Sequence, residues 1–244
     1  MRKPLIFIFV IFLFLSLNGC LRESAESASL TISPSTEATV LLPIKPLCQY
    51  PDFPTGCEVT ATVMALNYYG DNISVADFID NYLLTDCTFY RKGLTLYGPN
   101  PNKVFVGNPR SENSYGCFSP VIKQALINRL ADNMQVIDTT GLSLDSLCEK
   151  YVNNKTPIII WASTDMKPFS KGQSWRFSNG TRFTWPSGEH CLLLVGYSGK
   201  DLFFCDPHYS HIVAYPRETV SLRYQELGCQ SLAIAPINEK SRRP

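Results

Sequence analysis

Hydrophobic positions divide the chain into an apolar N-terminal run, a polar stretch and a long region that mixes two periodicities. Between residues 57 and 70, apolar side chains recur at helical spacing, and Gly70 follows where a helix would end. The same spacing predicts helices at 120–130 and 143–151. Short apolar runs predict strands, at 158–162, 189–197 and 202–207.

Two segments of this region show no sustained period. Residues 86–118 are rich in Gly and Pro, which predicts a long ordered loop rather than regular elements. Residues 163–188 are polar with scattered aromatic side chains, and we expect a loop that leads into the next strand. Tyr115, Trp175 and Trp185 are candidates for the wall of a substrate cleft. The alternative is that the tryptophans only cover a satellite core.

The N-terminal apolar run has the features of an export signal. After a basic start, Pro4 to Leu17 would form a helix of about 21 Å, too short for a hydrocarbon core of ~30 Å. This pattern is typical of a signal peptide. The run ends in Leu17-Asn18-Gly19-Cys20, which resembles the lipobox of bacterial lipoproteins, although Asn18 replaces the usual small Ala or Ser. We therefore expect a lipid on Cys20; an ordinary signal peptide or an uncleaved anchor is the alternative.

These boundaries divide the chain into four predicted parts. Residues 1–19 are the lipoprotein signal peptide, 20–42 a flexible tether rich in Ser, Thr, Glu and Ala, 43–237 the folded domain and 238–244 a polar tail. We expect a monomer at the extracytoplasmic face of the cell membrane, held there by its lipid. A secreted protein is the alternative.

Composition and charge narrow the class of protein. Of the 244 residues, 45% are hydrophobic, which is ordinary for a globular core. The net charge of +1 excludes the large basic surface that drives nucleic-acid binding. Nine cysteines are many for a cytosolic enzyme, and export permits disulfides. Cys191 with Cys205, or Cys87 with Cys117, could bridge, but the sequence does not decide connectivity.

Cys57 stands at the predicted start of the first helix. Thr55 and Glu58 match the Ser/Thr-x-x-Glu capping box, which would make Thr55 the N-cap and put Cys57 in the first turn. The unpaired N–H groups and the positive end of the helix dipole there favour a thiolate, the nucleophilic form of cysteine. The alternative is a small cysteine that is simply buried under the helix start.

The last two predicted strands form a hairpin with His190 at its entry and Asp206 at its exit. A strict four-residue loop would put these side chains on opposite faces. We therefore expect a loop of odd length, or a bulge at Gly196 or Gly199, that brings them to one face. Together with Cys57 they would supply a Cys-His-Asp triad, in which the histidine takes the thiol proton and the carboxylate orients the histidine.

Two further sets of residues bear on the chemistry. Gln49 can supply a side-chain amide to an oxyanion, together with the backbone N–H of Cys57, although a lone Gln is more often an exposed residue. Cys205, His208 and His211, with Asp206, could be read as metal ligands, but their C-x-x-H-x-x-H spacing is not a common zinc pattern. We therefore predict neither a metal nor a cofactor, and expect these histidines on the surface or in support of the triad.

Four blocks of the sequence together resemble the peptidase C39-like family. They follow one another in the family's order, at residues 49–70, 100–118, 157–163 and 189–207. The resemblance implies an α+β, papain-like fold. In that fold an N-terminal helical half carrying the nucleophile packs on a C-terminal antiparallel β-sheet.

The resemblance also implies catalytic roles for Cys57 as nucleophile, His190 as general base, Asp206 as orienting residue and Gln49 as oxyanion donor. The expected activity is that of an extracytoplasmic cysteine peptidase that forms an acyl-enzyme. Two alternatives stay open: a cell-wall amidase or peptidoglycan peptidase with the same triad, and a catalytically inactive papain-like binding module. The expected partners are a peptide or cell-wall peptide substrate and, through the lipid, the membrane, with no nucleic acid.

Overall fold

The computed structural model describes residues 39–237. The predicted signal peptide, the predicted lipid site at Cys20 and the tail 238–244 lie outside the described residues, as does most of the predicted tether. Within the described part of the chain, no helix is both long and apolar enough to cross a membrane.

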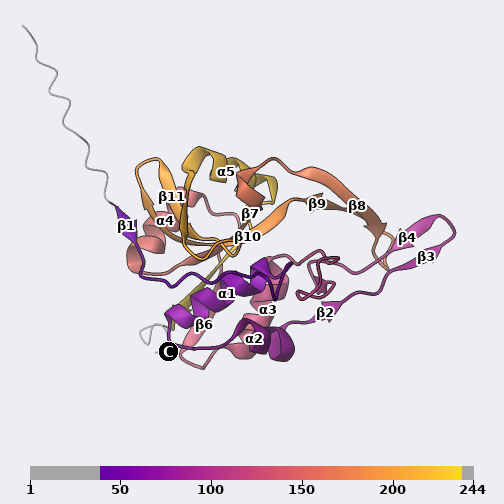
Figure 1. The fold of residues 1–244 in the computed structure, drawn as a ribbon, viewed down its shortest axis with the longest axis horizontal. Coiled ribbons are helices and arrows are strands. Elements are labelled where there is room, and N and C mark those ends of the chain that lie inside the picture. The colour runs from indigo at the N-terminus through magenta and orange to yellow at the C-terminus, as the bar shows by residue number, and fades with distance from the viewer. Residues whose placement is uncertain (1–38, 238–244) are drawn as a thin grey trace, which may run out of the picture. The chain divides into compact units, whose positions relative to one another are not determined.

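A seven-stranded antiparallel sheet forms the centre of the domain (Figure 1). Its strands lie in the order β12, β11, β10, β7, β13 and β6, and β1 pairs with β10 beyond the end of β7. Their bounds are β1 Val40–Leu41, β6 Met134–Asp138, β7 Ile158–Ser163, β10 Glu189–Ser198, β11 Asp201–Cys205, β12 Ile212–Pro216 and β13 Ser231–Pro236. The predicted central strand and the predicted hairpin are both confirmed.

The central strands are buried on both faces because their side chains alternate between two hydrophobic cores. In β7, Ile159 and Trp161 belong to the first core, whereas Ile158 and Ile160 belong to the second. This arrangement explains why β7 is a continuous apolar run rather than an alternation of apolar and polar residues.

Helices cover both faces of the sheet. The first core contains side chains of three helices, α1 (Cys57–Tyr68), α2 (Val75–Tyr82) and α3 (Ser119–Arg129). The second contains side chains of α4 (Leu144–Lys150) and α5 (Arg217–Glu226). Short 3-10 turns are η1 (Val152–Asn154) and η2 (Thr164–Met166). The three helices predicted from periodicity are confirmed as α1, α3 and α4, while α2 and α5 were not predicted.

The helix that carries Cys57 lies in the middle of the first core. All ten residues from Cys57 to Leu66 are buried, including polar residues such as Thr60. Because α1 is surrounded by protein on every side, a side chain of its first turn is shielded from water whichever way it points. This burial governs the chemistry of Cys57 described below.

The two segments predicted as loops contain short strands, so that prediction is wrong at these positions. A separate four-stranded sheet consists of β3 (Tyr90–Lys92), β4 (Thr95–Tyr97), β8 (Ser170–Arg176) and β9 (Arg182–Ser187), and β2 (Thr85–Asp86) pairs with β5 (Phe105–Val106). Tyr97 of β4 pairs with Arg176 of β8, far along the chain. β2, β3, β4 and β5 have two or three residues, too few for an alternation to be recognised. The longer β8 is almost entirely polar, and β9 contains Pro186.

The first described strand, β1, lies slightly before the predicted domain boundary at residue 43. Val40 pairs with Tyr197 and Leu41 with Gly196, and Leu42 is buried. A Cβ at Gly196 would lie 2.3 Å from the backbone oxygen of Val40, so this close approach of two strands needs a glycine.

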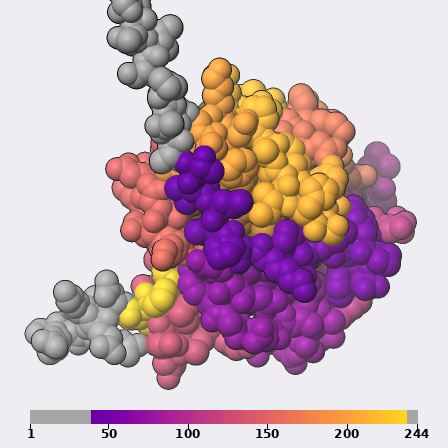
Figure 2. Space-filling view, turned by 60° about the vertical axis from the view of Figure 1, so that its left-hand side comes forward, coloured from indigo at the N-terminus to yellow at the C-terminus, as the bar shows by residue number. Residues whose placement is uncertain are grey.

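The arrangement confirms the predicted fold class, an α+β, papain-like domain with the helix of Cys57 packed on an antiparallel sheet. Figure 2 shows the indigo N-terminal part of the domain lying directly against the orange C-terminal strands. Residues from the two ends of the domain can therefore contribute to one site.

Candidate active site

α1 begins at Cys57, so this cysteine lies in the first helical turn, where the sequence predicted it. The cap differs from the prediction, because Gly56 is the N-cap and no side chain caps the helix. Thr55 instead donates its hydroxyl to the backbone oxygen of Ser111, at 3.0 Å. The predicted capping box is therefore wrong, since that motif requires Thr55 and Glu58 to bond each other's backbone N–H groups.

Glu58 points into the interior beside Cys57 and is fully buried. Its Oε1 accepts a hydrogen bond from the backbone N–H of Cys117 at 2.6 Å, and its Oε2 accepts one from the Cys57 thiol at 3.3 Å. Gly116, at φ +148°, leaves the space for this carboxyl group, since a Cβ there would lie 2.4 Å from Glu58 Oε1. Glu58 is thus a residue of the site, whereas the sequence pattern predicted that it caps the helix.

A second carboxyl group lies in the same place. The Cys57 sulfur, one carboxylate oxygen of Glu58 and one of Glu189 all lie within 4.8 Å of one another. Glu189 Oε1 is buried and has no hydrogen-bond partner among the described residues. Burial raises the pKa of both carboxyl groups, and the neighbouring Glu58 raises that of Glu189 further. Two carboxylates this close repel each other, so the resting pair retains a proton.

These surroundings raise the pKa of the Cys57 thiol well above its ordinary value. Burial contributes most, followed by Glu58 and Glu189, while a hydrogen bond from the backbone N–H of Cys191 opposes them. The resting cysteine is therefore a thiol, whereas its position at a helix start predicted a thiolate. Burial dominates because a helix N-terminus stabilises an anion by about 1 kcal/mol, while desolvating a buried ion costs several kcal/mol.

Replacing Glu58 with Gln is expected to make Cys57 easier to ionise. Glutamine keeps an oxygen for the Cys117 N–H but removes the negative charge that raises the thiol pKa. At mildly alkaline pH, where Glu58 is ionised, the alkylation rate of Cys57 by iodoacetamide should rise about threefold to tenfold. Peptide mass spectrometry measures this rate, with Glu149→Gln on the exposed face of α4 as the matched control. Equal rates in the two variants would contradict a charged Glu58 beside the thiol.

β10 and β11 bring His190 and Asp206 together at one end of their hairpin. The pairing of the two strands shifts by one residue between Leu194 and Gly196, which confirms the bulge predicted near Gly196. Because successive side chains of a strand point to opposite faces, this extra residue turns His190 and Asp206 to the same face. His190 Nε2 lies 2.7 Å from Asp206 Oδ1.

Asp206 is fully buried and takes part in three hydrogen bonds. In addition to His190, the backbone N–H of His208 donates to Oδ1 at 2.9 Å and the Tyr215 hydroxyl donates to Oδ2 at 2.8 Å. Burial raises the pKa of Asp206, but the contact with His190 and the two other bonds outweigh it and lower the pKa to about 2. Asp206 is therefore ionised at neutral and mildly acidic pH.

The contact with Asp206 determines which ring nitrogen of His190 is available. Nε2 faces Asp206, so Nδ1 is the nitrogen left for exchanging a proton. The Cys57 sulfur accepts from the backbone N–H of Cys191, the residue that follows His190 in β10. The Cys57 thiol of α1 therefore lies against β10, beside the residue that carries the imidazole.

His208 packs on His190 and shields it from solvent. The ring centroids are 4.1 Å apart, and His208 Nε2 lies 3.3 Å from the Tyr50 hydroxyl. Burial and the neighbouring His190 lower the pKa of His208 to about 4, so this ring is neutral at neutral pH. The sequence left His208 either on the surface or in support of the triad, and its contact with His190 favours the second role.

Gln49 lies in the same site and is almost completely buried. Its backbone N–H donates to the oxygen of Pro207, the residue after Asp206, at 2.8 Å. Its side-chain Nε2 donates to the oxygen of Pro54, also at 2.8 Å. A primary amide carries two hydrogens, so Nε2 retains one for a further acceptor.

The tryptophans lie in a packed aromatic cluster of the first core rather than on an open wall. Trp175 is 2% exposed and Trp185 is 7% exposed. The Tyr115 ring packs against both, at centroid distances of 5.0 and 5.4 Å. Trp175 also donates its indole N–H to the oxygen of Pro99 at 2.7 Å. The structure therefore supports the packing alternative for both tryptophans, which offer little surface to a substrate.

The described cysteines are all free. Eight of them fall within the described residues, and none of these eight forms a disulfide. Cys48 and Cys87 are exposed, whereas Cys191 and Cys205 are buried on neighbouring strands. The two disulfide pairs that the sequence left open are therefore absent from this structure.

The side chains of Cys205, His208 and His211, the alternative metal ligands, do not lie close together as a set. Among the described residues, two groups of side chains lie close enough to share an ion. Asp206, which the sequence added to this set, and His208 belong to one of them, whereas Cys205 and His211 belong to neither. One group joins His208 to His190 and Asp206, and the other is Cys57 with its two glutamates. Both groups consist of the candidate triad and its immediate neighbours.

A cysteine that starts the N-terminal helix, together with a histidine that a carboxylate holds on an antiparallel sheet, is the arrangement of a papain-like protein. The chain belongs to the peptidase C39-like family: the profile described as "Peptidase_C39 like family" matches residues 41–232. This range contains all four blocks on which the resemblance rested.

Two proteins similar to this chain can be compared with it. The uncharacterized protein YvpB of Bacillus subtilis (strain 168) is 27% identical over 180 residues, which cover 73% of this chain and 68% of that protein. A crystal structure described as a C39-like peptidase from Bacillus anthracis superposes with a TM-score of 0.70 at 24% identity, covering 83% of this chain and 100% of that chain. The structural match shows that the two chains share a fold.

Proposed function

We propose that this protein is a cysteine peptidase that cleaves peptide bonds with the triad Cys57, His190 and Asp206. One observation carries the proposal. A buried His190 is held through Nε2 by an ionised Asp206, and the Cys57 thiol lies against the next residue of the same strand. A thiol, a base and an orienting carboxylate are the groups that acyl transfer to sulfur requires.

In the proposed reaction, the proton of the Cys57 thiol passes to His190 Nδ1 as the sulfur attacks the carbonyl carbon of the scissile bond. The Asp206 carboxylate stabilises the imidazolium that forms. His190 then gives this proton to the leaving amine, and breakage of the C–N bond leaves a thioester on Cys57. A water molecule, deprotonated by His190, hydrolyses the thioester and restores the thiol.

Substrate binding has to open the resting site in this proposal. Cys57 is 7% exposed and His190 is 1% exposed, and the resting thiol donates its hydrogen to Glu58. In this proposal the His208 ring, which packs on His190, and the Tyr50 ring, which packs on His208, move aside when a substrate carbonyl approaches the sulfur. The thiol hydrogen must also turn from Glu58 toward His190 before transfer.

Gln49 and the first turn of α1 form the proposed oxyanion hole. The backbone N–H of Cys57 belongs to the first turn, where N–H groups have no partner within the helix. The second hydrogen of Gln49 Nε2 is the other donor. Both would bond the carbonyl oxygen once it becomes negatively charged in the tetrahedral intermediate.

Replacing Gln49 with Ala is expected to lower kcat by about 10²- to 10³-fold with little change in KM, because the lost bond forms in the transition state. Gln49→Glu keeps the length but lacks the donor, so it should be impaired as well. Steady-state kinetics on a cleaved peptide measure both effects, with Gln225→Ala on the exposed face of α5 as control. A rise in KM with kcat unchanged would contradict the role of Gln49 in the oxyanion hole.

The proposed location is the extracytoplasmic face of the cell membrane, with a lipid on Cys20 as the anchor and secretion as the alternative. The support is the sequence pattern of residues 1–20. Metabolic labelling with a fatty acid, compared between the full chain and Cys20→Ser, tests the anchor. Equal labelling of the two chains would exclude Cys20 as the lipid site.

The activity is tested by incubating the purified protein with peptide libraries and, in parallel, with cell-wall peptide fragments. New termini are identified by mass spectrometry. Cleavage of unmodified peptides that disappears in Cys57→Ala would support the peptidase. Cleavage confined to cell-wall fragments would point to the peptidoglycan alternative, while binding without any cleavage would overturn the enzyme assignment in favour of a binding module.

A further inference from the structure

The four-stranded sheet of β3, β4, β8 and β9 carries the unbalanced positive charge of the described chain. Residues 87–107 and 166–188, which contain these strands and their turns, hold seven Lys or Arg and no Asp or Glu. We call these two segments the basic arm. The remaining described residues hold nine Lys or Arg against 17 Asp or Glu. A chain that is nearly neutral as a whole therefore has a strongly positive part, so the exclusion of a basic surface from the net charge alone is wrong for this part.

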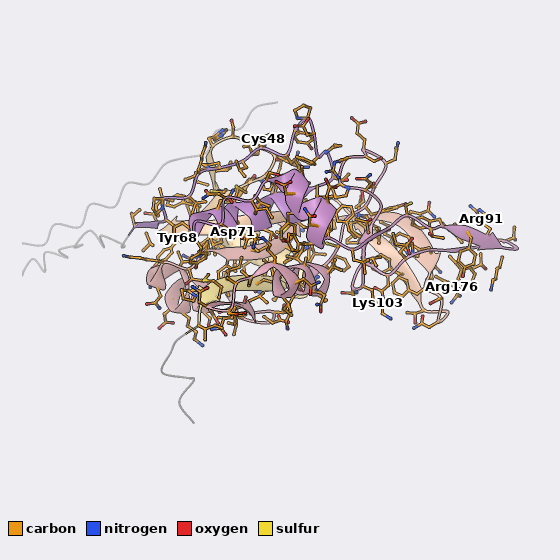
Figure 3. The ribbon with its side chains drawn as sticks, turned by 90° about the horizontal axis from the view of Figure 1, so that it is seen from below. Cys48, Tyr68, Asp71, Arg91, Lys103 and Arg176 are labelled. Atoms are coloured by element: carbon orange, nitrogen blue, oxygen red, sulfur yellow. The ribbon has the colours of Figure 1, made fainter. Side chains whose placement is uncertain are left out.

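The cations of the basic arm are exposed, at Arg91, Lys92, Lys103, Lys167, Lys171, Arg176 and Arg182. Lys167 forms an ion pair with Asp165, and the other six form no ion pair within the described part of the chain. The two segments add their charges because β4 pairs with β8. Figure 3 shows Arg91, Lys103 and Arg176 at the same end of the domain.

The turn between β3 and β4 carries an exposed apolar side chain at the tip of the basic arm. Leu94 is 99% exposed and contributes to neither hydrophobic core. Behind it, the Tyr90 and Tyr97 rings stack at 5.2 Å, and Lys92 Nζ lies 5.8 and 5.7 Å from their centroids. An apolar tip, amphipathic rings behind it and flanking cations match the order of acyl chains, interface and phosphates at a bilayer surface.

We propose that the basic arm docks on an anionic lipid bilayer, with Leu94 inserted at the boundary of the acyl chains and the surrounding Lys and Arg on lipid phosphates. A soluble polyanion would neutralise the same cations but would leave Leu94 in water. The arm is held firmly at its base, where Trp175 is buried and bonded to Pro99. The proposal is independent of the peptidase activity and of a lipid on Cys20.

The experiment measures binding of residues 37–244 to lipid vesicles by co-sedimentation. These residues form one compact unit, and its described part contains both hydrophobic cores. We expect binding to vesicles of equal parts phosphatidylglycerol and phosphatidylcholine to be at least about tenfold tighter than to phosphatidylcholine alone. Added salt should weaken it, because each phosphate contact is screened.

Two variants test the charge and the tip separately. The double variant Arg91→Glu and Lys92→Glu should weaken binding by about 25-fold or more, since each cation near an anionic surface contributes about fivefold. Leu94→Ser should weaken it several-fold without affecting the fold, because Leu94 touches no core. The matched control changes two exposed cations outside the arm, Lys150→Glu and Lys200→Glu, and should stay within about twofold of the parent.

Thermal melting of each variant verifies that the fold is retained. Equal affinity for neutral and anionic vesicles would overturn the proposal, as would equal losses in the arm variant and the control. Binding of soluble polyphosphate that Leu94→Ser leaves unchanged, without binding of vesicles, would assign the arm to a polyanion instead of a membrane.

Discussion

Replacing Cys57 with Ala is expected to abolish peptide cleavage, with kcat/KM reduced by about 10⁴-fold or more, while the domain stays folded. The sulfur is the group that forms the bond to the substrate, and no other described cysteine lies in the triad. Removing it leaves a cavity of about one atom in the first core, which costs about 1 kcal/mol. Progress curves on a cleaved peptide measure activity, and thermal melting measures stability. Cys148→Ala, which removes a buried cysteine from the second core, is the matched control.

His190→Ala should be equally inactive, but this variant leaves the buried carboxylate of Asp206 without its partner. Breaking such a pair destabilises a protein by about 3–5 kcal/mol, so loss of activity alone would be ambiguous. His190→Gln resolves this, because its amide can still donate toward Asp206 but cannot act as a base. An inactive His190→Gln that melts close to the parent would support the base, whereas substantial cleavage by either variant would remove His190 from the reaction.

The second large effect is expected for Asp206→Asn, with kcat lowered by about 10²- to 10⁴-fold, less than for Cys57→Ala. The imidazole keeps some orientation from an amide at this position, but it loses the negative charge that stabilises the imidazolium. Because the carboxylate acts through His190 rather than on the substrate, KM should change little. The pH profile of kcat/KM should change shape as well, since the base is no longer held by an anion. An unchanged profile would indicate a structural role only.

Asp206 is also expected to control stability at acidic pH. Its pKa is about 2 in the folded protein and about 3.9 in an unfolded chain, so the unfolded state binds the proton more tightly. The resulting stabilisation, about 2 kcal/mol, is present above about pH 4 and is lost as the pH falls toward 2. Melting temperatures across this range should fall steeply for the parent and less steeply for Asp206→Asn. Tyr215→Phe, which removes one hydrogen bond to Asp206, should lie between them.

His208 acts in the same direction at higher pH. Its pKa is lowered to about 4, below the ordinary value of about 6.5, so the unfolded state binds more protons between these values. Stability therefore falls as the pH drops through this window. The Asp206 variants therefore need to be compared below pH 4, where the free energy of unfolding no longer changes with pH because of His208.

Much of the fold could be predicted because its signals are local. The helices at α1, α3 and α4 and the hairpin of β10 and β11 each show their period within one continuous segment. The bulge near Gly196 could be predicted because a hairpin with His190 and Asp206 at one end has few registers that put both on one face. In the basic arm, β3 and β4 escaped prediction because they have three residues each. The longer β8 is almost entirely polar and β9 contains Pro186, so neither shows the apolar pattern of a core strand.

In the site, too, single residues were predicted wrongly where their surroundings depend on distant segments of the chain. Glu58 satisfied the sequence pattern of a capping box, yet its partner is the N–H of Cys117, 59 residues along the chain. Trp175 and Trp185 looked suited to a cleft wall, but the aromatic side chains that cover them come from separate segments. No local signal distinguishes these outcomes, because each depends on which distant segment packs against the residue.

The sequence by itself determined the family, the helix that starts at Cys57, the hairpin that carries His190 and Asp206, and Gln49 as a member of the site. These depend on spacing and residue type within short stretches. Only the tertiary structure decided that Cys57 rests as a thiol, that Glu58 and Glu189 share its surroundings, and that the positive charge gathers on one arm. The physical reason is that burial and the distance between charges arise when remote segments pack together, and neither quantity exists in the extended chain.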